Sequence, residues 1–233
     1  MALTTDVLGE DRELARPLDE GRRALARREG IAAVLELPSG TWDAREAADN
    51  ARGGFGLLIL AGLLVRRVGR DGRFGAELLC AGDIVRPWEH DGEETTVPFD
   101  TTWRVLAPTR LAVLDLAWAR RMGPFPEVGG ALIGRAMERS RRLAVNMAIA
   151  QHPRLEMRLE VLLWHLAERL GRVRTDGVHL TLPVTHETLA NLVAARRPSV
   201  SAALGALAER GVVRRDGEGW VLLGDPPADL DAA

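Results

Sequence analysis

Hydrophobic and polar positions change their spacing part-way along the chain. From about Gly30 to Trp118, short apolar runs alternate with turn signals that recur every 8 to 15 residues. Asp71-Gly72 marks a tight hairpin inside this region. Such spacing predicts an antiparallel roll or sandwich. The runs predicted as strands are Ile31–Leu37, Leu57–Val68, Phe74–Leu79, Thr101–Leu106 and Leu111–Leu116.

From Pro126 to Gln151 the spacing becomes that of one long helix. Small and apolar residues recur every four and three positions, which is an a/d heptad seam. The pattern leaves two interpretations open, a helix that packs on its own domain or one that pairs with a second copy. The seam residues are Gly129, Ile133, Ala136, Ser140, Leu143, Met147 and Ala150.

The last 60 residues predict a helix-turn-helix followed by a two-stranded wing. A leucine-rich helix runs from about Pro153 to Leu170, and a short strand follows at Val178–Leu182. Thr185 is a good N-cap for the next helix, and Ala194-Ala195 lies at the turn between two helices. Pro198 suits the first turn of the second helix. The strands Val212–Arg215 and Trp220–Leu223 form the wing.

A winged helix with this polar face is suited to binding DNA. The face opposite the apolar one carries Arg197, Ser199 and Ser201. An Arg at the N-terminal end of a helix can place its guanidinium against guanine in the major groove. Hydroxyls at helix N-termini can bind phosphates. The residues predicted to contact phosphates are Thr185, Ser199, His186, Arg214 and Arg215.

The charge of the whole chain hides that of this module. The net charge is −2, yet residues 172–224 hold seven Arg and five acidic residues and carry +2. This excess of positive charge is small. We therefore expect the affinity for DNA to depend on a few Arg residues at defined positions, and we expect DNA binding by each protomer to weaken only slightly as the salt concentration rises.

Composition and motifs exclude several classes of protein. The single Cys80 excludes a disulfide framework and sites built from several thiolates. The longest apolar run, Phe55–Val65, is too short to span a membrane, and the N-terminus does not read as a signal peptide, so we expect a cytoplasmic protein without membrane contact. No nucleophile elbow, P-loop or dinucleotide fingerprint occurs, so an enzyme is not expected. Residues 90–94 could hold a divalent ion, but a solvated acidic loop is the favoured interpretation, and we predict no metal site.

Residues 185–215 resemble the C-terminal domain of the cyclic-AMP receptor protein and fumarate-nitrate-reduction regulator (CRP/FNR) superfamily. The matching strings are Thr185-x-x-x-Leu189-Ala190-x-Leu192-Val193, Arg197-Pro198-Ser199-Val200-Ser201-x-Ala203-Leu204 and Leu207-x-x-x-Gly211-Val212-Val213. The resemblance implies that Arg197 reads a guanine, that Ser199 meets a phosphate and that Ser201 lies on the groove face. Arg196 stands where the family usually has Ser or Thr, and it is assigned to a base contact with a phosphate contact as the alternative.

The resemblance extends over most of the chain. Gly82-Asp83-Ile84 and residues 103–115 are similar to parts of the family's cyclic-nucleotide-binding-like roll. The helix 126–151 falls where the family has its dimerisation helix, which implies a homodimer joined along the seam residues Ile133, Ala136, Ser140, Leu143 and Met147. The implied fold class is α+β, with an N-terminal antiparallel, jelly-roll-like β-roll, a long dimerisation helix and a C-terminal winged helix-turn-helix.

The nucleotide-binding positions depart from the family pattern. Arg86-Pro87-Trp88-Glu89 follows the Gly-Asp turn where binding members have a Gly-Glu pair. Asp100-Thr101 stands where they have Arg-Ser or Arg-Thr, and a carboxylate there would repel a phosphate. Cyclic-nucleotide binding is therefore disfavoured, and no cofactor is expected. Trp88, Asp100 and Trp103 are weak candidates to line a pocket for another ligand.

Together these features predict a homodimeric, sequence-specific transcription regulator that binds a near-palindromic operator in double-stranded DNA. A contact with RNA polymerase is a further prediction. The alternative is a winged-helix interaction or architectural module that reads little sequence. The predicted parts are a polar segment (1–25), the roll (26–122), the dimerisation helix (123–152), the winged helix (153–224) and an acidic tail (225–233).

Overall fold

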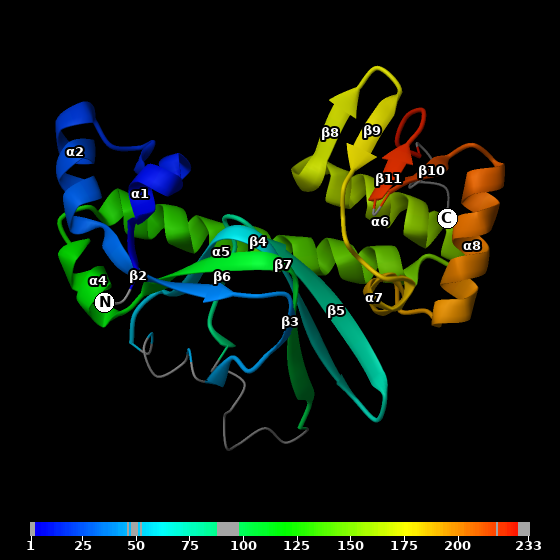
Figure 1. Cartoon of the computed structure of the whole chain (residues 1–233), viewed down its shortest axis with the longest axis horizontal. Coiled ribbons are helices and arrows are strands. Elements are labelled where there is room, and N and C mark those ends of the chain that lie inside the picture. The colour runs from blue at the N-terminus through cyan, green and yellow to red at the C-terminus, as the bar shows by residue number, and fades with distance from the viewer. Residues whose placement is uncertain are drawn as a thin grey trace. The chain divides into compact units, whose positions relative to one another are not determined.

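The computed structural model describes residues 3–45, 47, 51, 53–87, 98–217 and 219–227. Contacts divide the chain into two compact units, of which the first holds residues 1–70 with 77–141 and the second holds residues 71–76 with 142–233. Both the α+β class and the order of roll, long helix and winged helix-turn-helix are confirmed (Figure 1).

A seven-stranded sheet forms the roll of the first unit. Its strand order is β1-β2-β7-β4-β5, with β3 pairing with β7 and β6 pairing with β4. Leucine, valine and isoleucine side chains from β4 and β7 are buried in its core, which is why the sequence of β4 is a nearly continuous apolar run. The strands are β1 (Thr4–Asp6), β2 (Ile31–Leu37), β3 (Gly40–Trp42), β4 (Gly56–Arg70), β5 (Arg73–Cys80), β6 (Ile84–Val85) and β7 (Asp100–Leu114).

Strand β7 corrects one detail of the sequence prediction. The sequence predicts two strands separated near Pro108, whereas β7 is continuous from Asp100 to Leu114. The partner strand β4 absorbs the irregularity, since its register against β7 shifts at three places between Ile59 and Leu64. Gly62 lies there with a φ of 101°, and a Cβ at this position would clash with the Thr109 hydroxyl.

Short helices at the N-terminus pack against the sheet. The segment 1–25 is polar in composition, yet Val7, Leu8 and Leu14 are fully buried in one cluster with Trp118 and Val128. The sequence pattern misses this cluster because its apolar residues are few and spread over four short elements. These elements are α1 (Val7–Glu10), the 3-10 helix η1 (Arg12–Ala15), α2 (Glu20–Glu29) and α4 (Leu116–Arg121).

The long helix α5 (Pro126–Gln151) has the bounds that the sequence predicts. His152-Pro153 follows it, and α6 (Leu155–Leu170) begins two residues later. Within the described part of the chain, no helix is both long and apolar enough to cross a membrane.

The second unit combines α6 with the helix-turn-helix and a small sheet. The predicted wing pairs with a second hairpin, so the sheet has four strands in the order β10-β11-β9-β8. The sequence prediction included β9 but missed β8, which is short and largely exposed. The elements are β8 (Gly171–Arg174), β9 (Gly177–Leu180), α7 (His186–Leu192), α8 (Arg197–Glu209), β10 (Val213–Asp216) and β11 (Gly219–Leu222).

Candidate nucleic-acid interface

Helices α7 and α8 lie next to each other and are joined by a short turn (Figure 1). Thr185 caps α7 as predicted, because its hydroxyl accepts a hydrogen bond of 3.1 Å from the Thr188 amide. Ala194 in the turn has a φ of 52°, a left-handed conformation that a small side chain tolerates better than a branched one. The apolar faces of the two helices are buried and fix their crossing; they comprise Leu189, Leu192, Val200, Ala203, Leu204 and Leu207.

The N-terminal end of α8 presents arginine side chains to solvent. Arg196, Arg197 and Ser199 are exposed. Within the part of the chain that the structure describes, neither guanidinium makes an ion pair or a side-chain hydrogen bond. The donors of both guanidiniums are therefore available to a ligand. A guanidinium with free donors is suited to a base edge or a phosphate.

Ser201 lies one helical turn after Arg197 on the same face of α8, and it is also exposed. Its hydroxyl donates to the Arg197 carbonyl at 3.2 Å and lies 2.8 Å from Nδ1 of His186. His186 is the first residue of α7 and is half-buried. The predicted base contact Ser201 and the predicted phosphate contact His186 are therefore joined by a hydrogen bond.

The two predicted phosphate contacts of the wing each have a partner within the protein. Arg214 donates to the Asp176 carboxylate at 2.7 Å, and the Arg215 guanidinium lies 4.5 Å from the centre of the Trp220 ring. The hydrogen bond from His179 lowers the pKa of Asp176, and the bond from Arg214 lowers it further. Both guanidiniums remain at the surface of the wing, so they are held in place but still accessible.

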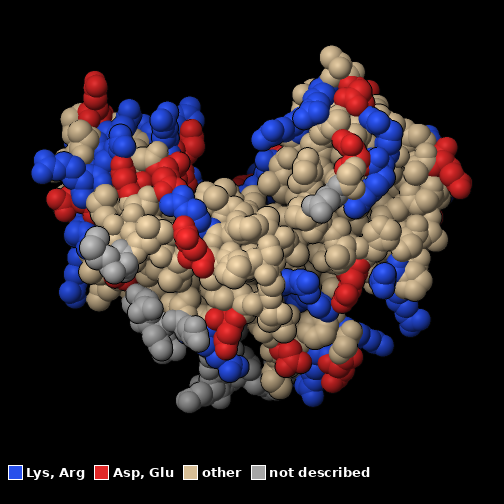
Figure 2. All heavy atoms as spheres, in the orientation of Figure 1, with Lys and Arg blue, Asp and Glu red and all other residues tan. Residues whose placement is uncertain are grey.

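On the face of this unit that Figure 2 shows, charged side chains of both signs occur together. On the face in Figure 2, blue and red side chains are interspersed over the small sheet and the helices beside it. Binding by bulk positive charge is therefore not the pattern of this surface. The exposed guanidiniums of Arg196 and Arg197 lie together at the start of α8.

Comparison with known proteins identifies the helix-turn-helix. Residues 157–228 match the family described as Crp-like helix-turn-helix domain. That match contains α7, α8, their turn and the wing, with Arg196 and Arg197 at its centre. Residues 157–228 therefore form a Crp-like helix-turn-helix domain.

Solved structures of transcription regulators and related proteins have a similar fold over most of the chain. A transcriptional regulator of the CRP/FNR family from Thermus thermophilus, TTHA1359, is 20% identical with a TM-score of 0.57, and the match covers 82% of this chain and 93% of that chain. A CooA mutant from Carboxydothermus hydrogenoformans is 15% identical with a TM-score of 0.64, covering 95% and 92%. FixK2 from Bradyrhizobium japonicum is 15% identical with a TM-score of 0.61, covering 84% and 93%. No curated protein matches the sequence.

Helix α5 carries an exposed stripe along its length. Exposed residues recur at spacings of three and four: Gly130, Ile133, Met137, Ser140, Ala144 and Met147. Ile133, Met137 and Met147 are 58%, 68% and 69% exposed, which is unusual for large apolar side chains. The predicted seam shares Ile133, Ser140 and Met147 with this stripe. Of its other members, Ala136 is exposed and lines a cavity of the roll, whereas Leu143 is half-buried.

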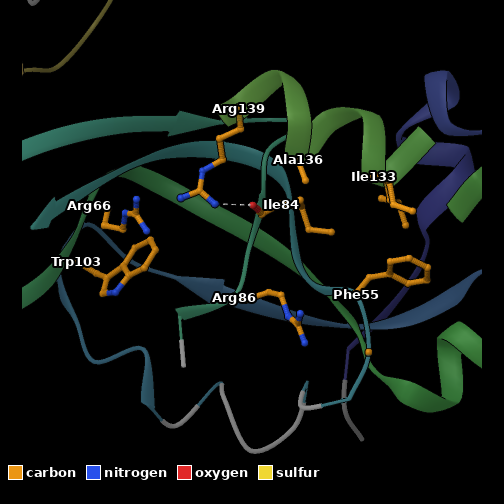
Figure 3. A pocket seen from close by; sticks show the side chains of 10 residues that line it. Phe55, Arg66, Ile84, Arg86, Trp103, Ile133, Ala136 and Arg139 are labelled. Carbon is orange, nitrogen blue, oxygen red and sulfur yellow. Dashed lines mark hydrogen bonds between the residues drawn. The ribbon is translucent and has the colours of Figure 1, made fainter. Parts of the chain in front are cut away.

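That cavity lies in the first unit between the roll and α5, and its volume is about 290 Å³ (Figure 3). Trp103, Phe55 and Ile84 contribute apolar walls, and Arg66, Arg86 and Arg139 contribute guanidiniums. Of the predicted pocket residues, Trp103 lines the cavity and is buried. Asp100 is not among the lining residues but is exposed at the start of β7, and Trp88 lies outside the described residues.

A buried carboxylate beside the cavity binds two of its arginines. The Glu77 carboxylate accepts hydrogen bonds from Nε and Nη2 of Arg139 at 2.6 and 2.8 Å. It also forms an ion pair with Nη2 of Arg66 at 3.0 Å. Burial lowers the pKa of Arg66, Glu77 opposes this shift, and the neighbouring Arg139 adds to it. Sequence reasoning missed this cluster because its members lie on β4, β5 and α5, and no motif connects residues so far apart in the chain. The cluster ties α5 to the roll.

No group of three or more His, Cys, Asp or Glu suited to a metal ion occurs among the described residues. The acidic run at residues 90–94, which the sequence analysis weighed as an ion site, lies outside them.

Proposed function

We propose that this protein is a transcription regulator that binds a near-palindromic operator as a homodimer and reads its sequence with the N-terminal half of α8. Arg197, Arg196 and Ser201 face the bases, while Thr185, Ser199, His186, Arg214 and Arg215 hold phosphates. Two recognition helices would then meet half-sites about 34 Å apart, one turn of the duplex. A cytoplasmic location and a contact with RNA polymerase stay predictions.

The observation that carries this proposal is the pair of exposed guanidiniums at the start of α8. Arg196 and Arg197 have no partner in the described part of the chain, so DNA does not have to break an ion pair to engage them. The helix they begin is anchored by a buried apolar face, which limits its motion against α7. Free donors on an anchored helix favour specific reading over loose electrostatic attachment.

The substitution Arg197→Ala tests base reading. Loss of a guanidinium that contacts a guanine is expected to cost about 1–3 kcal/mol of binding free energy on the best operator, which is about 5- to 150-fold in affinity. The preference for one base per half-site should relax at the same time. Fluorescence anisotropy on the selected operator and on its single-base variants measures both effects.

Arg210→Ala is the matched control on the same helix. Arg210 is exposed at the C-terminal end of α8 and pairs with Glu160 at 3.5 Å, so its removal changes the charge equally without removing a predicted base contact. We expect its operator preference to equal that of the parent. If Arg197→Ala binds the best operator as tightly as Arg210→Ala does, α8 is not the reading helix.

Dimerisation is proposed along the exposed stripe of α5. A parallel pair of these helices would bring each large side chain, Ile133, Met137 and Met147, against its copy. The small residues Gly130, which precedes Ile133, and Ala144, between Met137 and Met147, would permit close approach. A second copy is the occupant that such a self-complementary stripe fits, since its spacing is that of a coiled coil.

We further propose that the roll does not respond to cyclic AMP. The guanidiniums of Arg66 and Arg139 already face the buried Glu77 carboxylate, so a cyclic phosphate would have to compete with it. Asp100 stands where nucleotide-binding members of the family have Arg, and it is not among the residues that line the cavity, so this position contributes no guanidinium to a phosphate.

Titration with cyclic AMP tests this part of the proposal. Calorimetry should detect no heat of binding, and the melting temperature should not rise. A ligand present at a hundredfold excess over its Kd would stabilise the protein by about 2.7 kcal/mol, so a bound nucleotide would measurably raise the melting temperature. A saturable heat together with a raised melting temperature would contradict the proposal.

A further inference from the structure

One hydrogen bond between side chains joins α7 to the exposed face of α8. Nδ1 of His186 lies 2.8 Å from the hydroxyl oxygen of Ser201. The same hydroxyl lies 3.2 Å from the Arg197 carbonyl, to which it can donate. Ser201 is exposed one turn after Arg197, on the face that the proposed function directs at the bases.

The hydroxyl of Ser201 has one hydrogen and two lone pairs. If its hydrogen goes to the Arg197 carbonyl, Nδ1–H of His186 donates to one lone pair and the other remains free. If its hydrogen goes to Nδ1 instead, both lone pairs remain free. In either arrangement the hydroxyl hydrogen is used within the protein, and what Ser201 offers to DNA is an acceptor.

A serine without such partners can serve either as donor or as acceptor, and it therefore discriminates poorly between bases. An acceptor discriminates, because in the major groove only the amino groups of adenine (N6) and cytosine (N4) donate. Guanine O6 and N7 and thymine O4 are themselves acceptors, so opposite the Ser201 oxygen no hydrogen would be available to form a bond.

We propose that His186 acts as a specificity-determining residue by holding Ser201 as a hydrogen-bond acceptor, which selects adenine or cytosine at one position of each half-site. This inference rests on the proposed function, since it requires that α8 reads bases. It assigns to His186 a role through Ser201 that is separate from any contact of its own with a phosphate.

Substitutions at His186 separate the two roles. Asn carries its amide at the same distance from Cα as Nδ1, so His186→Asn can keep the hydrogen bond to Ser201. Gln carries its amide one bond further out, near the place of Nε2, so His186→Gln loses that bond but keeps reach toward a phosphate. Ser201→Ala removes the reading group, and the double variant His186→Gln/Ser201→Ala tests whether the two residues act together.

The experiment is selection of operators from a randomised DNA pool by the full-length parent and each variant, followed by affinity measurements on single-base substitutions. The parent should select adenine or cytosine at the position that Ser201→Ala affects, by about fivefold or more over guanine and thymine. His186→Asn should keep this preference, and His186→Gln should lose it at this position alone. The double variant should show the same preference as Ser201→Ala.

The failure of this inference differs from the failure of base reading itself. If the parent selects no consensus, or Arg197→Ala selects the parent's consensus with equal affinity, base reading by α8 is wrong. If the parent has a consensus but selects guanine or thymine at the position set by Ser201, the inference is wrong. It is equally wrong if Ser201→Ala alters no base preference or if His186→Gln keeps the parent's preference.

Discussion

Met137→Glu is expected to convert the proposed dimer into a monomer and to lower its affinity for the full operator by about 10²- to 10⁴-fold. Met137 lies in the middle of the exposed stripe of α5, where its side chain is 68% exposed in one chain. In a parallel pair, two glutamates would face each other without a counter-ion, and burying like charges in this way is strongly unfavourable. The loss of affinity follows because the second half-site is no longer bound intramolecularly.

Sedimentation equilibrium and anisotropy on full and half operators measure these two effects. The matched control is Leu25→Glu, which adds the same charge at an apolar residue of α2 that is 51% exposed and lies off α5. Leu25→Glu should remain dimeric. Because Met137 is exposed in the single chain, the substitution should leave far-ultraviolet circular dichroism unchanged. A parent that is monomeric at micromolar concentration, or a Met137→Glu variant that stays dimeric, would contradict the α5 interface.

Glu77→Gln is expected to lower the free energy of unfolding by about 3–5 kcal/mol, as is typical when one partner of a buried ion pair is removed. The Glu77 carboxylate is 6% exposed and accepts from both guanidinium nitrogens of Arg139 that face it. Without its charge, Arg66 and Arg139 would repel each other in a site where water screens them poorly. The Nε of Arg66 is already buried without a hydrogen-bond partner, so the site has no spare acceptor to replace the carboxylate.

Urea denaturation of the parent and the variant measures the difference. Glu36→Gln is the matched control, since Glu36 is 64% exposed and lies 3.8 Å from Arg110. Exposed pairs of this kind contribute about 0–1 kcal/mol, so the control should unfold close to the parent. An equally small effect at Glu77 would mean that the cluster does not hold α5 to the roll.

The elements that the sequence predicted well are those stabilised by interactions close along the chain. Helix α5 has the predicted bounds because Pro126 suits its first turn and Pro153 prevents its continuation. Thr185 caps α7 by bonding an amide three residues away. The wing strands are predicted from the alternation of apolar and polar residues on both sides of the turn at Asp216-Gly217. Each of these signals depends on neighbours within a few residues, so a single sequence carries it.

The elements that the sequence missed depend on partners far along the chain. Continuity of β7 through Pro108 is possible because β4 shifts its register opposite that residue, which no local pattern of β7 reveals. The N-terminal segment is structured because Val7 and Leu8 are buried with Trp118, more than one hundred residues away. Because residues 1–25 are mostly polar, their overall composition does not reveal that a few apolar side chains make such contacts.

The sequence by itself determined that this chain has a roll, a long helix and a winged helix-turn-helix, and that the second helix of that motif begins near Arg197. Only the tertiary structure decided which face of α5 is left open, because the roll covers one side of that helix and leaves the stripe around Met137 exposed. It alone joined Glu77 to Arg66 and Arg139, and His186 to Ser201. The physical reason is that periodicity and capping are local properties, whereas burial and the pairing of charges depend on which distant segments fold against one another.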